Sequence, residues 1–206
     1  MTGVEVTRGL VGFEECLRGL GMPVVDRLRP GLTREQVDQV AAEFGVRLSQ
    51  DAAAWWMWHD GDRLNYEDDW GVPSLTPFRV FCGLRSSLQR AAELHELTWD
   101  QEAFDDLVRS GSQAVDFMFD RQYVILLHRE QPLVMDCRDP DAVDSPTGLY
   151  TYEGIGRTIT LAERIDWWHW ALDNGFWIPT SDGDWDMDLT RAPGQLIGLH
   201  ARDNVD

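Results

Sequence analysis

The sequence predicts an α+β fold in which N-terminal helices pack on a mainly antiparallel β-sheet and a C-terminal helix closes the domain. Apolar residues recur at helical spacing in the N-terminal half, whereas short apolar runs separated by three-residue turns begin near residue 114. A further helical segment follows these runs. The chain has 206 residues, 43% of them hydrophobic, and shows neither repeats nor an interdomain linker. We therefore expect residues 1–206 to form one domain with a large core.

Two helices are expected before residue 46. The first spans residues 7–20, where four apolar residues share one face: Leu10, Phe13, Leu17 and Leu20. The second is marked at both ends. Thr33 and Gln36 have the spacing of a capping box, and Gly45 stands where a left-handed C-cap residue belongs.

The stretch AAAWWMWHDG, residues 52–61, predicts a third helix over residues 51–59 that is ended by a turn at Asp60-Gly61. The tryptophans that we expect in the core, from their helical positions, are Trp55, Trp58 and, in the last helix, Trp168. Those that we expect to be exposed are Trp56, Trp70 and Trp185.

The middle of the chain changes from loop to helix. Residues 65–77 are polar and turn-rich and predict a loop, and residues 79–81 predict a short strand. A helix over residues 84–97 follows, with an inward face made of Leu84, Leu88, Ala91 and Leu94 or His95.

Three apolar runs predict an antiparallel meander: residues 115–119, 123–128 and 132–137. YVILL, within the second run, is apolar throughout, which is typical of a central strand covered on both faces. Residues 138–148 predict a loop, and residues 149–154 a further strand.

The closing helix is expected over residues 161–174. Thr160 and Glu163 form a second capping box before it, and Gly175 can cap its end. The chain beyond it is rich in aspartate, so we expect residues 178–206 to form an acidic tail.

The charge of the chain indicates the kind of partner it has. Its 36 acidic and 18 basic residues give a formal net charge of −18, which repels nucleic-acid phosphates and anionic membranes. A basic protein would be attracted to such a surface, although acidity also serves solubility alone. No apolar run is long enough to span a membrane, and the N-terminus lacks the pattern of a secretory signal. Cys16, Cys82 and Cys137 have neither disulfide nor metal-site spacing, so we expect reduced thiols and a cytoplasmic location.

Two ordered sets of residues resemble the SUKH superfamily. In that family a helix ending in Gly leads to a Leu-Pro-x-Asp turn, and a second helix carries aromatic or aliphatic residues and closes on Asn-Gly or Asp-Gly. The matching residues are Leu48, Asp51, Trp55, Trp58, Asp60 and Gly61, while Ser49 stands where the family usually has Pro. Serine can still cap the second helix.

The second set lies downstream. The family has a strand running into an Asp-x-x-Pro turn, a Gly-containing strand, and a last helix followed by Gly and an aromatic residue. The residues similar to this pattern are Asp136, Asp139, Pro140, Gly148, Gly175 and Trp177. The resemblance covers residues 32–177, which leaves residues 1–31 as a helical extension. It implies a non-catalytic protein-binding fold, most often an immunity protein that neutralises a secreted bacterial toxin, and it transfers no functional residue by position.

His59-Asp60 is the strongest candidate for catalysis or metal binding. Adjacent residues of a helix point about 100° apart, so the two side chains are not expected to converge. The chain has no Gly-x-Ser-x-Gly motif, and His95-Glu96 lacks the second histidine of a zinc-protease motif. We therefore expect no catalytic residue, metal or cofactor.

Two acidic segments are the candidates for partner binding. The first comprises Tyr66, Glu67, Asp68, Asp69 and Trp70, in which aromatic rings flank carboxylates. The second comprises Asp182, Asp184, Trp185 and Asp186, which begins like a calcium-binding loop but has Met187 and Pro193 where that loop needs Gly and Glu. As a strand, the second segment would turn its carboxylates to one side and Trp185 to the other. It would form either a solvated edge or an acidic strip for a basic partner.

Three functions follow as hypotheses. The leading one is a cytoplasmic immunity protein that binds a basic toxin domain and blocks its substrate site. The second is a regulatory or scaffold module of the same fold without a toxin partner. The third is a metal-dependent hydrolase that uses His59, Asp60 and nearby carboxylates. The oligomeric state does not follow from the sequence.

Overall fold

The computed structural model describes residues 3–63, 74–109, 119–129, 131–142, 144–151 and 154–192. Its helices are α1 (Gly3–Gly19), α2 (Arg34–Glu43), α3 (Gln50–Trp58), α4 (Leu84–Thr98), α5 (Gln101–Arg109) and α6 (Leu161–Asp173), with the 3₁₀ turns η1 (Pro23–Arg27) and η3 (Leu189–Arg191). Its strands are β1 (Leu28–Pro30), β2 (His59–Asp62), β3 (Val80–Phe81), β4 (Tyr123–His128), β5 (Leu133–Asp136), β6 (Pro146–Thr151), β7 (Gly154–Ile155), β8 (Ile159–Thr160), β9 (Trp177–Pro179) and β10 (Trp185–Met187).

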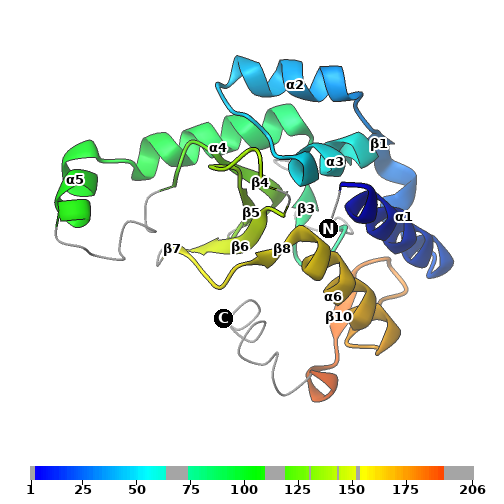
Figure 1. Cartoon of the computed structure of the whole chain (residues 1–206). Helices are drawn as coiled ribbons and strands as arrows, with labels where there is room; N and C mark the ends of the chain where they lie inside the picture. Colours follow the sequence, from blue (N-terminus) through cyan, green and yellow to red (C-terminus); the bar gives the residue numbers. More distant parts are fainter. Residues whose placement is uncertain are drawn as a thin grey trace.

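The α+β class, the antiparallel sheet and the closing helix are confirmed. The main sheet has the order β3-β4-β5-β6-β7, with β8 also paired to β6, and each pairing is antiparallel. Two separate ribbons, β1–β2 and β9–β10, are also antiparallel. In Figure 1, α1, α3 and α6 gather at one end of the sheet, while α4 and α5 run along it to the other end.

The predicted central strand is β4, which lies between β3 and β5 and is buried from Tyr123 to Leu127. From Tyr123 to Leu126 its side chains alternate between two apolar clusters, as the period of a strand requires, and a register shift in the pairing with β5 brings Leu127 into the main core as well. Val124 and Leu126 belong to the main core, which includes residues of α1, α3 and α6. Tyr123 and Ile125 belong to a smaller cluster with Ala91 of α4. Both faces of the strand are therefore covered.

An aromatic cluster joins four elements of the main core. The Trp55 ring lies 4.8 Å from that of Phe81, 5.7 Å from that of Trp58 and 5.9 Å from that of Trp168, measured between centroids. The Phe13 ring is 5.3 Å from that of Trp168. Residues from α1, α3, β3 and α6 thus meet at one point, and the predicted burial of Trp55, Trp58 and Trp168 is confirmed.

The predicted helix ends are confirmed where the signal is local. Thr33 with Gln36, and Thr160 with Glu163, form complete capping boxes. Ser49 caps α3 and accepts a hydrogen bond from the amide of Ala52, so serine fills the position where the SUKH pattern has proline. Each cap satisfies an amide that the helix itself leaves without a partner.

Several predicted boundaries are wrong. The first helix begins at Gly3 and ends at Gly19, so Leu20 lies beyond it and is 47% exposed. Helix α5 was not predicted. Residues 146–148, expected in a loop, are the first half of β6. Residues 115–118 of the first predicted strand lie outside the described residues.

Asp60-Gly61 is not a turn, which corrects the prediction for the end of α3. The helix ends at Trp58 and the chain continues directly into β2, which pairs with β1. An Asp60 carboxylate oxygen accepts a hydrogen bond from the amide of Leu84 at 2.8 Å and thereby satisfies the first turn of α4. Gly61 has a φ of +80°, and a Cβ there would lie 2.3 Å from the amide nitrogen of Gly83.

Trp56 and Trp185 are buried, so the prediction that they are exposed is wrong. The Trp56 indole N–H donates to the carbonyl of Cys82, and that of Trp185 donates to the carbonyl of Ser74. The expected tail is structured over the range that holds Trp185, since β9 and β10 form a hairpin against α6.

Replacing Gly61 with Ala should destabilise the protein much more than replacing Gly45 with Ala. Gly45 has a φ of +69° but nothing within 4 Å of its would-be Cβ, so Ala there costs only backbone strain of about 1–2 kcal/mol. At Gly61 the same strain combines with a backbone clash, and we expect more than about 3 kcal/mol. Urea unfolding of the two variants measures the difference, and equal losses would contradict the close approach of β2 to Gly83.

Candidate partner-binding site

The β9–β10 hairpin presents different chemistry on its two faces. Asp186 pairs with Ile178, and Trp185 with Pro179. Because side chains alternate along a strand, Trp177 and Trp185 point into the molecule, while Ile178 and Asp186 are exposed. The outer face thus combines an apolar side chain, which is 40% exposed, with carboxylates.

Aromatic contacts fix the hairpin to α6. The Trp177 ring lies 4.9 Å from that of Trp167 and 5.8 Å from that of Trp185, again between centroids. Trp167 also contacts Phe176 edge-on at 6.0 Å. Offset and edge-to-face contacts of this kind stabilise beyond the apolar area that they bury. The outer face is therefore held in one orientation.

Three carboxylates of the hairpin face solvent. Asp182, Asp184 and Asp186 are exposed, and none forms an ion pair with an arginine among the residues that the structure describes. The Thr180 hydroxyl donates to Asp182 and holds the pKa of that carboxyl below its ordinary value. The hairpin is accordingly an anionic surface at neutral pH.

Asp188, the last carboxylate of this run, has a structural role instead. It accepts hydrogen bonds from the amide and hydroxyl of Thr190 and pairs with Arg191 at 3.0 Å. These contacts, led by that of Thr190, lower the pKa of Asp188. Trp185 is structural as well, because its burial prevents it from contacting a partner directly.

The hairpin also contacts the end of the other predicted acidic segment. Ser74 is the first described residue after that segment, and its carbonyl accepts a hydrogen bond from Trp185 at 2.9 Å. The predicted contact residues of the segment lie outside the described residues: Tyr66, Glu67, Asp68, Asp69 and Trp70. The hydrogen bond to Ser74 therefore fixes the hairpin to the chain that follows the segment.

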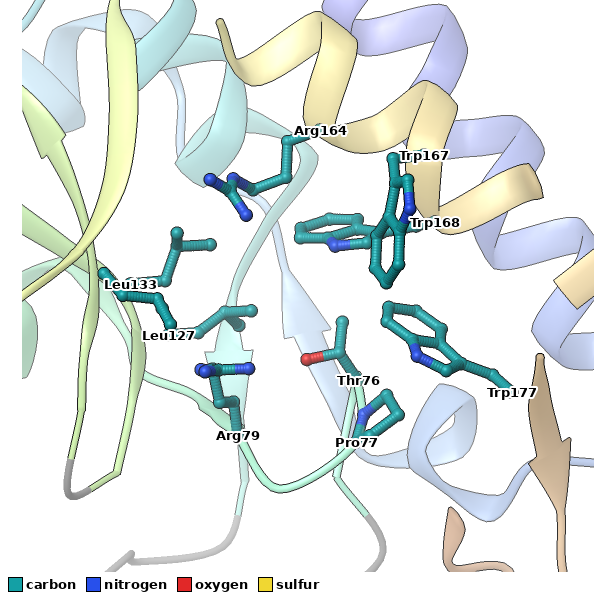
Figure 2. Close-up of a pocket in the computed structure, with 10 residues that line it drawn as sticks. Thr76, Pro77, Arg79, Leu127, Leu133, Arg164, Trp167, Trp168 and Trp177 are labelled. Atoms are coloured by element: carbon teal, nitrogen blue, oxygen red, sulfur yellow. The ribbon is translucent and has the colours of Figure 1, made fainter. Parts of the chain in front are cut away.

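A pocket lies beneath the hairpin, between α6, the sheet and residues 76–79 (Figure 2). Arg79 and Arg164 reach toward it from opposite sides, and Trp177 forms one of its walls. Arg164 is buried and donates to the hydroxyl of Thr147 at 2.9 Å. The space that a water molecule can enter is about 20 Å³, which is room for about one water and far too little for a substrate.

His59 and Asp60 do not form a site together. His59 Nδ1 donates to the carbonyl of Arg29 at 2.7 Å, and Nε2 lies 3.0 Å from the Glu14 carboxylate, whereas Asp60 caps α4. Burial raises the pKa of Glu14, but hydrogen bonds from His59, Trp58 and Arg18 outweigh it and leave the pKa below its ordinary value. The histidine thus joins α1 to β2 through its contacts with Glu14 and the carbonyl of Arg29.

Cys16 and His169 form a thiol–imidazole pair that the sequence did not predict. The Cys16 sulfur is 3.8 Å from Nδ1 of His169, whose Nε2 faces the carbonyl of Gly9 at 3.0 Å. Burial, Asp173 and Glu15 all raise the pKa of Cys16, so the thiol remains neutral and is a poor nucleophile. Cys16 and His169 are 153 residues apart in the chain, so no local sequence pattern indicates that they are in contact.

Within the residues that the structure describes, no group of three or more His, Cys, Asp or Glu side chains is arranged to hold a metal ion. No described helix is both long enough and apolar enough to cross a membrane.

No protein-family model matches the chain, and no curated protein matches it either. Its function is therefore inferred from the chemistry and arrangement of its own residues.

Asp51, one of the residues that match the SUKH pattern, is fully buried. Neither of its oxygens has a hydrogen-bond partner among the described residues, although the backbone N–H of Ser145 lies close enough to favour the charged form. Ser49 and Ser145, also fully buried, are hydrogen-bonded to each other nearby. Burial dominates and raises the pKa of Asp51 from 3.8 to about 6.

Replacing Asp51 with Asn should change the pH dependence of stability. A carboxyl whose pKa is higher in the folded state favours folding at low pH, and this contribution is lost as the pH rises from about 4 through 6. We expect the free energy of unfolding of the parent, relative to Asp51→Asn, to fall by roughly 2–3 kcal/mol between pH 4 and pH 8. Urea unfolding at several pH values measures this difference in the free energy of unfolding. Asp166→Asn, at an exposed carboxylate, is the control. A difference independent of pH would contradict the raised pKa.

Proposed function

We propose that the chain is a non-catalytic protein-binding domain of the SUKH type, an immunity protein that acts in the bacterial cytoplasm. It binds and neutralises a basic toxin domain. The observation that carries this proposal is the β9–β10 hairpin, where Asp186 pairs across the strands with the exposed Ile178 and where Asp182 and Asp184 are exposed in the connection between the strands.

Charge supplies the speed of binding. The net charge of −18 attracts a basic domain over a distance of about a Debye length, and the exposed carboxylates of the hairpin give the attraction a direction. Two proteins that meet in this way associate faster than neutral proteins, and the gain is lost as salt is added. Rapid association suits an inhibitor that must act before a toxin damages the cell.

Shape and rigidity supply the affinity. Ile178 offers an apolar contact among the carboxylates, and an arginine-rich surface can cover it with its side-chain stems while its charged groups meet the acids. Because Trp167, Trp177 and Trp185 fix the hairpin before binding, little conformational entropy is lost in the complex. The toxin is then blocked by occlusion of its substrate site.

The residues that resemble the SUKH family support the choice of domain type. The helix–turn–helix entry is present, with Ser49 as the cap of α3. After β5, Arg138 pairs with Asp136 at 2.6 Å, and an oxygen of Asp139 accepts from the amide of Asp141, so that residues 136–141, which resemble the Asp-x-x-Pro turn of the family, are hydrogen-bonded locally. These features are caps and turns, and they bear on the fold and not on a reaction.

Co-expression tests the proposed role directly. The chain is produced together with each secreted toxin domain encoded in the same genome, and growth is scored. We expect rescue from one toxin, whose domain is basic. Failure to rescue growth from any of them would overturn the immunity role.

Removing the hairpin charges should slow association with that toxin. We expect the triple variant Asp182→Asn, Asp184→Asn, Asp186→Asn to lose about tenfold in association rate at low salt, and to show a weaker dependence on salt. The matched control removes three exposed charges elsewhere: Glu35→Gln, Glu96→Gln and Glu102→Gln. Stopped-flow kinetics over a range of salt concentrations measures the association rate of each variant and its dependence on salt. Equal losses in the two variants would show that the net charge, and not the hairpin, is responsible.

A further inference from the structure

A second surface, on α1 and α3, differs in chemistry from the hairpin. A groove of about 580 Å³ lies between the two helices and reaches the first residue of α2. Val4 and Val11 of α1 and Met57 of α3 line it, and these side chains are 63%, 42% and 44% exposed. Three of the large exposed apolar side chains of the protein therefore meet in one groove, and clusters of this kind mark interaction sites.

The groove is a consequence of how the two helices bury their other faces. Helix α1 buries Leu10 and Phe13 and leaves Val4 and Val11 outside. Helix α3 buries each of the tryptophans in AAAWWMWHDG, so that Met57 is the residue of this stretch that faces solvent. The amide of Leu32 donates to the carbonyl of Trp56 at 2.9 Å and fixes the start of α2 beside α3. The walls of the groove are thus formed by well-packed elements.

The charges that line the groove are positive. Arg8 of α1 and Arg34 of α2 are the charged side chains among its described lining residues, and both are exposed. Arg34 forms an ion pair with Asp38 of the same helix, with Nε 2.9 Å from a carboxylate oxygen. Among the described residues that line the groove, none carries a carboxylate. Although the protein as a whole is acidic, these two arginines make the groove locally complementary to carboxylates.

A second copy of the chain does not fit this pattern. A twofold contact through the groove would bring the same patch of both copies together, including two sets of Arg8 and Arg34 and no carboxylate of the described lining. Two copies also repel each other, because each has a net charge of −18. The complementary occupant is therefore a different polypeptide.

We propose that this groove binds an amphipathic helix of a second protein, with apolar residues one turn apart and acidic residues on its flanks. Apolar residues at i, i+3 or i+4, and i+7 would lie in the groove against Val4, Val11 and Met57, in the helix-in-groove mode. Methionine adapts its shape to such a ligand. Carboxylates on the flanks would meet Arg8 and Arg34.

This partner is distinct from the one proposed for the hairpin. Helix α1, which lines the groove, packs against α6, and α6 in turn contacts β9, so that α6 lies between the groove and the hairpin (Figure 1). The charges of the two surfaces are also opposite. The groove can therefore be occupied while the hairpin binds a basic domain, and failure of either proposal leaves the other standing.

A selection experiment tests the groove. The full chain is used to select from a displayed library of amphipathic helices that carry leucines one turn apart and random flanking residues. We expect enrichment of Asp and Glu on the flanks. The affinity of a selected peptide, measured by fluorescence anisotropy, should fall about tenfold in Val11→Glu and in Met57→Glu. It should be unchanged in Leu97→Glu, a control on α4 where the side chain is 81% exposed.

Three outcomes of the selection and binding measurements would overturn the proposal. They are the absence of any enriched helix, enrichment of Lys and Arg on the flanks, and binding that survives Val11→Glu and Met57→Glu. A concentrated sample that elutes as a dimer, and as a monomer after Val11→Glu, would also overturn it by assigning the groove to a second copy. Thermal unfolding of each variant shows that a loss of binding is not a loss of fold.

Discussion

The packing of Trp55 against Phe81, Trp58 and Trp168 is the constraint on which the rest of the structure depends. This cluster is where α1, α3, β3 and α6 meet, and aromatic side chains supply the largest buried areas of a core. It also positions the proposed binding surface. Because Trp168 is fixed in the cluster, its neighbour Trp167 on α6 is turned toward Trp177, and the hairpin is positioned by that contact. Two adjacent tryptophans thus connect the core to the proposed binding face.

The parts of the fold that could be predicted from the sequence are those whose signals are local. The capping boxes at Thr33 and Thr160, and the all-apolar central strand, depend on residues a few positions apart. Burial of Trp56 could not be predicted, because helical periodicity carries no information on a nine-residue helix that is buried on nearly every side. Asp60-Gly61 looked like a stop signal, but its strand partner lies about thirty residues earlier in the chain.

The candidate site shows the same division. Alternation placed the carboxylates Asp184 and Asp186 correctly on one side and Trp185 on the other. The sequence did not reveal that the side with Trp185 would be covered, since its contacts with Trp177 and Ser74 involve distant parts of the chain. Met57 was missed for a similar reason, because its exposure depends on how α1 packs beside α3. Long-range packing, and not residue chemistry, accounts for the differences between the predicted and the observed exposure of these residues.

The two proposed surfaces carry opposite charges on separate faces, with carboxylates on the hairpin and arginines at the groove. The central claim is that the hairpin is the face that meets the basic partner. Hydrogen–deuterium exchange of the free and toxin-bound chain tests it most directly. We expect the amides of residues 178–186 to exchange more slowly in the complex than in the free chain, and the exchange rates of α5 to be the same in both. Protection confined to other segments, with exchange in the hairpin as fast as in the free chain, would contradict it.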